Sequence, residues 1–197
     1  MQLVQIYATY NWRDNRGIDK FKYCPLCGTL FDHKQVAQKT RPFCPSCGYL
    51  FYRNPSPTVS VLVINKDKIL LGKRAGEPGK GKWALPSGYI EFEDDFLTAA
   101  IREVKEETGL EIEIVSILNV QSAFLPIDYH FLTIYLLAEK IGGNVRPNDD
   151  LEDAGWFSLS EPLPKMAFSP DVDLIQMYFN GHCQGINVKR KDSPNCK

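Results

Sequence analysis

The sequence lacks any apolar run long enough to cross a membrane. None of its hydrophobic stretches approaches the roughly 18 consecutive apolar residues that a spanning helix needs. The opening segment, MQLVQIYATYNWRDNR, also lacks a basic region followed by an apolar stretch. We therefore expect no membrane association, no secretory signal and a cytoplasmic location. Low-complexity tracts are absent too, and 197 residues fit one domain with at most a small additional module.

An excess of one charge sign is also lacking, since the sequence has 23 basic and 24 acidic residues. The apolar fraction of 44% and the charged fraction of 24% are typical of a globular protein with a real core. The charge is unevenly distributed, because residues 1–57 hold eight basic and three acidic side chains, a local charge of +5. This asymmetry is consistent with a phosphate or nucleic-acid partner and equally with a basic solvated face.

Cysteine is scarce, with six residues, but four of them form a pattern. Two CPxCG turns give the spacing C-x2-C-x16-C-x2-C, which indicates a zinc site. Four thiolates close the metal shell, so the predicted site is structural and supplies folding free energy that a short segment lacks. Two disulfides are the alternative, which the expected location disfavours. A structural or dimer-forming role is favoured over a pocket wall or a nucleic-acid contact. The predicted ligands are Cys24, Cys27, Cys44 and Cys47.

The chain order predicts an α/β protein. We divide it into an N-terminal extension (1–23), a zinc ribbon (24–53), an NPSP linker, a catalytic domain (58–180) and a flexible tail (181–197). Strands that precede and follow a central helix favour a sheet covered by helices. The expected strands are 58–65, 68–74, 111–122, 129–140 and 154–159, and the expected helices are 94–108, ended by Gly109, and 170–179.

The central helix carries an acidic cluster. Glu103, Glu106 and Glu107 are spaced i, i+3 and i+4, so they share one face of the helix. Close carboxylates repel one another unless a cation lies among them, and Mg²⁺ prefers such oxygen ligands. Arg102, four residues before Glu106, is placed to hold that carboxylate. A solvated helix face is the alternative interpretation.

These residues resemble the Nudix box, G-x5-E-x7-R-E-U-x-E-E-x-G-U, where U is aliphatic. Two positions depart from the family pattern: Asp94 replaces the first glutamate, and Pro-Ser-Gly replaces the usual Pro-Gly-Gly. The resemblance covers about residues 58–180, and the preceding four-cysteine segment is similar to that of the zinc-ribbon subgroup. The matching residues are Gly88, Arg102, Glu103, Val104, Glu106, Glu107, Gly109 and Leu110.

The resemblance implies an α/β/α sandwich with a mixed sheet and a nucleotide diphosphatase activity on substrates such as ADP-ribose, NADH or FAD. It implies Mg²⁺ or Mn²⁺ bound by the three catalytic glutamates and the Ser87 carbonyl, with Gly88, Asp94 and Arg102 in support. Glu103 or a neighbouring acid would accept the proton.

The sequence also contains candidate substrate contacts. Arg74 is placed to meet a phosphate, and Phe124 borders a segment suited to a base. Asp150 is a candidate catalytic acid, with Glu152 and Asp153 as competitors.

Two other functions stay open. One is a non-catalytic nucleotide sensor, supported by Asp94 and Ser87. The other is a nucleic-acid-binding protein that uses the basic, aromatic ribbon; the near-zero net charge and the intact box argue against both. The sequence leaves the nucleotide unnamed and the oligomeric state undecided, although homodimers are the commonest assembly.

Overall fold

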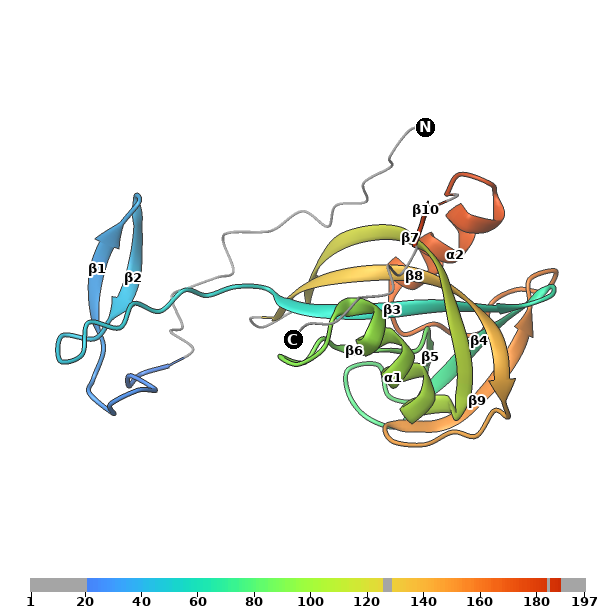
Figure 1. The fold of residues 1–197 in the computed structure, drawn as a ribbon, viewed down its shortest axis with the longest axis horizontal. Coiled ribbons are helices and arrows are strands. Elements are labelled where there is room, and N and C mark those ends of the chain that lie inside the picture. The colour runs from blue at the N-terminus through green and yellow to red at the C-terminus, as the bar shows by residue number, and fades with distance from the viewer. Residues whose placement is uncertain (1–20, 126–128, 184, 189–197) are drawn as a thin grey trace, which may run out of the picture. The chain divides into compact units, whose positions relative to one another are not determined.

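A computed structural model describes residues 21–125, 129–183 and 185–188, shown in colour in Figure 1. The side chains of residues 124, 125 and 129 are outside this description. The described chain separates into two compact units, the four-cysteine ribbon and the α/β unit that begins at Ser56. Most of the predicted N-terminal extension and the end of the predicted tail lie outside the described residues. Within the described part, no helix is long and apolar enough to cross a membrane.

The ribbon is built on one antiparallel hairpin. Strand β1 (Asp32–Val36) pairs with β2 (Lys39–Phe43), in a register that sets Val36 opposite Lys39. The two turn residues, Ala37 and Gln38, both have positive φ, at 48° and 64°. This backbone matches the right-handed twist of the flanking strands, which explains why a two-residue loop joins them.

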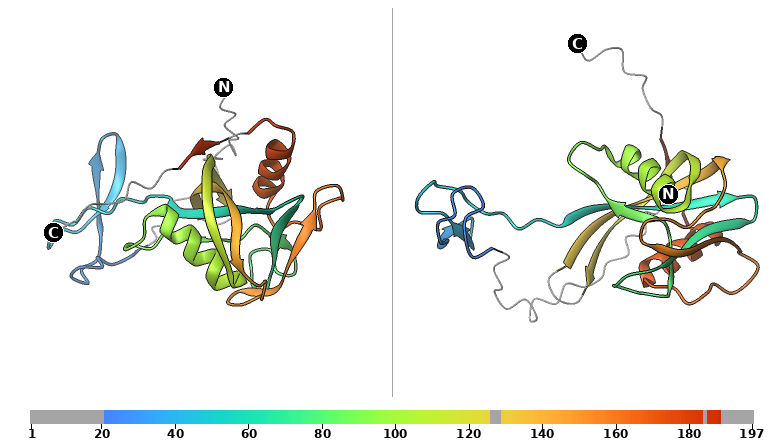
Figure 2. Two further views of the ribbon diagram at one scale, coloured as in Figure 1. Left: turned by 45° about the vertical axis from the view of Figure 1, so that its right-hand side comes forward. Right: turned by 90° about the horizontal axis from the view of Figure 1, so that it is seen from below.

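The α/β unit contains one mixed sheet of eight strands (Figure 2). The main path through the sheet is β10-β7-β8-β3-β4-β5, while β6 pairs with β3 and β9 pairs with β4. Strand β3 runs parallel to β8 and antiparallel to β4 and β6, so the predicted mixed sheet is confirmed. The strands are β3 (Ser56–Asn65), β4 (Lys68–Arg74), β5 (Trp83–Ala84), β6 (Ser87–Tyr89), β7 (Leu110–Leu125), β8 (Tyr129–Gly143), β9 (Leu151–Ser158) and β10 (Ile186–Asn187).

Helices α1 (Phe96–Thr108) and α2 (Ser169–Phe179) cover opposite faces of this sheet (Figure 2). Alternate residues of a strand point to opposite faces. In β3, Val61 packs in the core that contains Val104 of α1, whereas its neighbour Leu62 packs in the core that contains Leu174 of α2. The continuous apolar run in β3 is therefore what a strand covered on both sides requires. The predicted α/β/α sandwich is confirmed.

Helix α1 is bounded by two caps that the sequence contains. The Asp95 carboxylate accepts hydrogen bonds from the N–H groups of Leu97 and Thr98, at 2.8 and 2.9 Å. At the other end, Gly109 has a φ of 72° and donates its N–H to the Lys105 carbonyl. The helix begins at Phe96 instead of the expected Asp94, because Asp95 is the N-cap residue.

Several elements differ from the sequence prediction. The two- and three-residue strands β5, β6 and β10 were not predicted, because so few residues show no alternation. The predicted NPSP linker includes Ser56 and Pro57, which belong to β3. Strand β9 begins at Leu151 instead of residue 154. Within the predicted tail, β10 pairs antiparallel with β7.

Candidate active site and zinc ribbon

Two of the three predicted glutamates on α1 are buried against β6. Glu103 is 9% exposed and Glu107 is 3% exposed, whereas the Glu106 side chain is half exposed. The N–H of Ser87 donates to Glu107 Oε2 at 3.2 Å. A Cβ atom on Gly88 would overlap the carboxylate of Glu103, so only glycine leaves room for that group. The Ser87–Gly88 segment and the acidic helix thus fit together closely.

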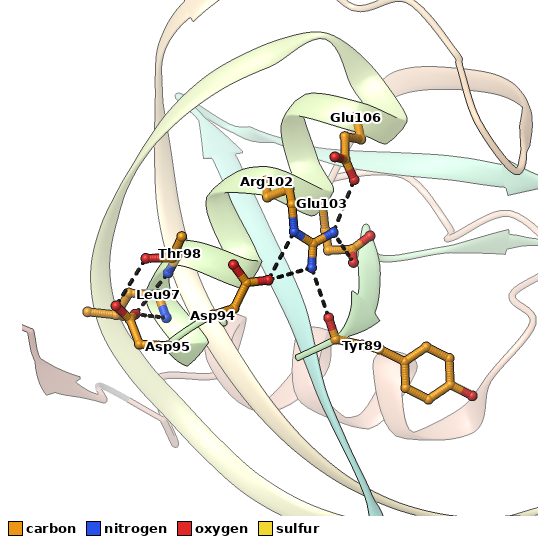
Figure 3. A network of polar contacts seen from close by, with 8 residues as sticks. All are labelled: Tyr89, Asp94, Asp95, Leu97, Thr98, Arg102, Glu103 and Glu106. Carbon is orange, nitrogen blue, oxygen red and sulfur yellow. Dashed lines mark hydrogen bonds and ion pairs between the residues drawn. The ribbon is translucent and has the colours of Figure 1, made fainter. Parts of the chain in front are cut away.

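Arg102 connects the carboxylates of this region, as Figure 3 shows. Its Nε and Nη2 atoms donate to Asp94 Oδ2 at 3.0 and 2.8 Å. Its Nη1 atom donates to Glu103 at 2.7 Å and to Glu106 at 3.1 Å, and Nη2 also donates to the Tyr89 carbonyl. The predicted contact with Glu106 is confirmed. The aspartate that replaces the usual glutamate still reaches the guanidinium, despite lacking one methylene.

The carboxylate oxygens of the three glutamates are less closely grouped than the four thiols of the ribbon. Among the described residues, the four cysteines form the group whose ligand atoms all lie within 4.8 Å of one another. Arg102 already neutralises part of the charge on Glu103 and Glu106, so a bound cation is not the sole relief of their repulsion. Helical spacing predicts a shared face, but it does not determine side-chain torsions or the position of a neighbouring arginine.

Glu107 is buried in an environment that disfavours its charged form. Burial raises the pKa of Glu107 to about 9, with further contributions from the negative charges of Asp150 and Glu103. The Ser87 N–H and the charge of Arg74 act in the opposite direction. Burial also raises the pKa of Glu103, although Arg102 counters the effect. Buried carboxylates with raised pKa values are stabilised in their ionised form by a nearby cation.

Asp150 is the acid that the loop after β8 brings toward Glu107. Asn148 fixes this loop on α1, because its N–H donates to the Glu107 carbonyl at 3.0 Å. Asp150 Oδ1 is buried without a hydrogen-bond partner, and Oδ2 lies 3.5 Å from Arg74 Nη2. Its two sequence competitors are engaged elsewhere: Glu152 pairs with Lys73, and Asp153 accepts the N–H of Ala154.

The donor atoms of this region fit a hard divalent cation. Buried carboxylates, an orphaned carboxylate oxygen and a nearby backbone segment form an all-oxygen set, which Mg²⁺ and Mn²⁺ favour over soft ligands. Gly88 lies against the Glu103 carboxylate, so β6 and the acidic helix both border this region. The metal ligands remain a prediction that this chemistry supports.

Arg74 lies at the edge of the same region. Its Nε donates to the Pro78 carbonyl at 2.8 Å, and its guanidinium lies 5.5 Å from the centre of the Phe168 ring. The side chain is largely buried, and its phosphate contact stays a prediction. The other predicted substrate contact, Phe124, belongs to β7, but its side chain lies outside the described residues.

Sequence reasoning missed one buried acid, Asp171 of α2. Its carboxylate accepts a hydrogen bond from the N–H of Leu85 at 3.1 Å. Leu85 lies two residues before Ser87 in the chain. An aspartate in the first turn of a helix usually complements the helix dipole at the surface. The sequence therefore carried no signal that this side chain is buried.

The four cysteines of the ribbon are arranged as a tetrahedral zinc site requires. All their Sγ atoms lie within 4.8 Å of one another, with 3.7 Å between Cys24 and Cys47 and 3.4 Å between Cys27 and Cys44. Four sulfurs about 2.3 Å from one zinc ion are about 3.8 Å apart, whereas a disulfide needs about 2.05 Å. The geometry fits a metal shell and excludes the disulfide alternative for these residues.

The basic and aromatic side chains of the ribbon contact each other. Lys34 lies over the ring of Phe43 at 5.1 Å, and Arg41 lies over Tyr52 at 4.4 Å. Aromatic rings that bind nucleic acid offer their faces to bases. In these two pairs, a basic side chain of the ribbon itself covers the face of the aromatic ring. These rings are therefore less available for stacking on bases, as the nucleic-acid-binding alternative would require.

Comparison with known proteins agrees with this geometry. The family model described as NUDIX domain matches residues 54–178. An ADP-ribose pyrophosphatase of Methanocaldococcus jannaschii is 38% identical over 121 residues, which are 61% of this chain and 71% of that protein. The NAD-capped RNA hydrolase NudC of Pseudomonas aeruginosa is 34% identical over 149 residues, which are 73% of this chain and 50% of that protein. The chain thus spans about half the length of this NudC relative.

A solved structure supports the same assignment. A NUDIX hydrolase from Nitrosomonas europaea has a TM-score of 0.73 and 27% sequence identity, covering 81% of this chain and 91% of that one. The family match begins before β3 and ends one residue before the end of α2. Within it, Glu103 and Glu107 are buried against Gly88 and Ser87. The chain belongs to the Nudix hydrolase family, with a four-cysteine cluster before its catalytic fold.

Proposed function

We propose that this protein is a metal-dependent pyrophosphatase that cuts the diphosphate linkage of a nucleotide of the ADP-ribose, NADH or FAD class. The observation that carries the proposal is the buried pair Glu103 and Glu107, packed against Ser87 and Gly88 and approached by Asp150. A surface helix with solvated acids would not bury two carboxylates against a neighbouring backbone.

Glu103, Glu106, Glu107 and the Ser87 carbonyl would hold Mg²⁺ or Mn²⁺. Such a cation neutralises the charge of the diphosphate and lowers the pKa of a nearby water. Glu106 is half exposed and is held by Arg102, which orients its carboxylate at the edge of the site. The four cysteines of the ribbon would hold Zn²⁺ in a structural role.

The reaction is the addition of water to one phosphorus and the cleavage of the bridging P–O bond, which yields two phosphomonoesters. The attacking water loses a proton, and Asp150 or Glu103 is positioned to accept it. Asp150 is supported by its unpartnered Oδ1 atom, and Glu103 by its burial beside Gly88. Arg74 keeps guanidinium donors beyond those that contact Pro78 and Asp150, and these suit a substrate phosphate.

Relatives support the substrate class. One is an ADP-ribose pyrophosphatase and another is a NAD-capped RNA hydrolase. ADP-ribose, NAD and FAD all contain an adenosine attached to a diphosphate. That common group is the chemistry that this site would recognise.

The test replaces Glu107 with glutamine, which keeps the size of the side chain and removes its charge. Turnover of ADP-ribose, NADH, FAD and a NAD-capped oligonucleotide is measured with Mg²⁺ or Mn²⁺. We expect Glu107→Gln to lose at least about 100-fold in kcat, the upper range for perturbed metal sites. Glu111→Gln is the matched control, because Glu111 is exposed and pairs with Lys105. Wild-type turnover in Glu107→Gln would show that the metal assignment is wrong.

The same panel distinguishes an enzyme from a nucleotide sensor. Calorimetric binding of ADP-ribose without product formation, in the presence of either metal, would favour the sensor. Hydrolysis of any member of the panel would exclude it as the main role.

A further inference from the structure

Asp171 is a buried acid on the face of the sheet opposite to α1. It lies in the first turn of α2 and is 4% exposed. Its Oδ2 atom accepts the N–H of Leu85 at 3.1 Å, and its Oδ1 atom accepts the hydroxyl of Tyr135 at 3.5 Å. Burying a carboxylate is costly unless it accepts hydrogen bonds, and these two contacts offset part of that cost.

Leu85 begins a short segment that leads to the proposed cation site. Leu85 packs in the core beneath α2, and two residues later Ser87 donates its N–H to Glu107. Gly88 then lies against the Glu103 carboxylate. The segment therefore passes from the α2 side of the sheet to the α1 side within four residues, with Asp171 at one end and both buried glutamates at the other.

The hydrogen bond from Leu85 to Asp171 holds the backbone at the first residue of this segment. The N–H of Leu85 is buried, and a buried backbone donor needs an acceptor. Pro86 is fixed as well, because its carbonyl accepts the N–H of Val61 at 2.9 Å. Asp171 connects this backbone to α2 through a hydrogen bond.

We infer that Asp171 is a positioning residue for the proposed cation site, acting through the N–H of Leu85 on the placement of Ser87 and Gly88. This inference rests on the proposed function, since it assigns Asp171 a role in holding the backbone that faces Glu103 and Glu107. Asp171 itself lies on the other side of the sheet and touches neither glutamate in the described contacts.

The side-chain chemistry suggests a decisive pair of variants. Asp171→Asn keeps an oxygen that can accept from Leu85, whereas Asp171→Leu has a similar size and no acceptor. Burial raises the pKa of Asp171 to about 7, because the charged form is costly at this position. Asp173→Leu, on the same helix two residues further, is the matched control.

The experiment titrates Mn²⁺ alone into each full-length protein by calorimetry and then measures nucleotide turnover. We expect Asp171→Leu to weaken Mn²⁺ binding at least 10-fold and to lower kcat at least 10-fold, with the KM for nucleotide within twofold. Asp171→Asn and Asp173→Leu should stay within threefold of wild type in every constant. A folded Asp171→Leu protein with wild-type Mn²⁺ affinity would overturn the inference, as would a wild-type protein that binds no Mn²⁺.

A second measurement on the wild-type protein covers the case in which Asp171→Leu does not fold. Binding couplings are reciprocal, so Mn²⁺ should slow amide hydrogen exchange at Leu85 as well as at Ser87 and Gly88. Slower exchange at Ser87 with no change at Leu85 would overturn the inference. Mn²⁺ binding that depends on Asp171, in a protein that hydrolyses no nucleotide, would support the positioning role and reject the proposed activity.

Discussion

Replacing Gly88 with alanine tests the close fit of the acidic helix on β6. The added Cβ would overlap the carboxylate carbon and both oxygens of Glu103, where ordinary contact begins at 3.4 Å. The atoms that it meets form the far end of a flexible side chain, so the carboxylate can retreat by about 1 Å or more while the backbone stays in place. Gly88 does not have the positive φ that would itself disfavour alanine.

The two consequences of this displacement differ in size. A misplacement of about 1 Å in a catalytic constellation can cost roughly 100-fold in rate. The stability change is small, because alanine stabilises a compatible glycine position by about 0.4–1 kcal/mol and loss of a partly exposed ion pair, here Arg102–Glu103, costs about 0.2–1 kcal/mol. We therefore expect a large loss of activity with a Tm shift of no more than about 4 °C.

The assay measures kcat/KM for ADP-ribose and the thermal unfolding midpoint of the same preparations. Gly76→Ala is the control, because a Cβ there meets nothing within 4 Å and Gly76 has no positive φ. It should leave kcat/KM unchanged and raise Tm by no more than about 4 °C. A folded Gly88→Ala protein with wild-type activity would refute the argument that Glu103 must occupy this position. Unfolding of Gly88→Ala would refute the argument that the displacement is confined to one side chain.

Three further predictions follow from the ribbon, from Asp150 and from Asp171. Cys44→Ser should abolish the bound zinc measured by metal analysis, whereas Cys183→Ser, outside the four-cysteine shell, should retain it; zinc retained in Cys44→Ser would contradict the assignment. If Asp150 accepts the proton, Asp150→Asn should lower kcat by roughly 10²–10⁴-fold, and Asp153→Asn should not. Burial raises the pKa of Asp171 to about 7 from an ordinary value of 3.8, so the folded state keeps a proton that the unfolded state releases between these values. The free energy of unfolding should therefore fall as pH rises from about 4 to 7, by up to about 1.4 kcal/mol per pH unit. Urea titrations at pH 5 and pH 7 should give Asp171→Asn a smaller decrease than wild type, and equal decreases would contradict this reasoning.

The longer elements could be predicted because many residues in each of them follow the same hydrophobic or helical pattern. Strand β3 has a long apolar run, and α1 combines helical spacing with Asp95 and Gly109 at its ends. Strands β5 and β6 have two and three residues, and their pairing is determined by β4 and β3. Such short strands exist only because neighbours are already in place, so no local pattern could indicate them.

The sequence by itself predicted the chemistry of the cysteine ribbon and of the acidic helix. The cysteine spacing predicted four converging thiolates, and helical spacing predicted Glu103, Glu106 and Glu107 on one face of a helix. Only the tertiary structure decided which acids meet. In the folded chain, Asp150 pairs with Arg74, and the half-exposed Glu106 pairs with Arg102. Asp171 is buried, where it accepts a hydrogen bond from Leu85. The reason is physical: residue type and helical period are local properties, whereas burial and side-chain pairing depend on segments that are distant in the chain.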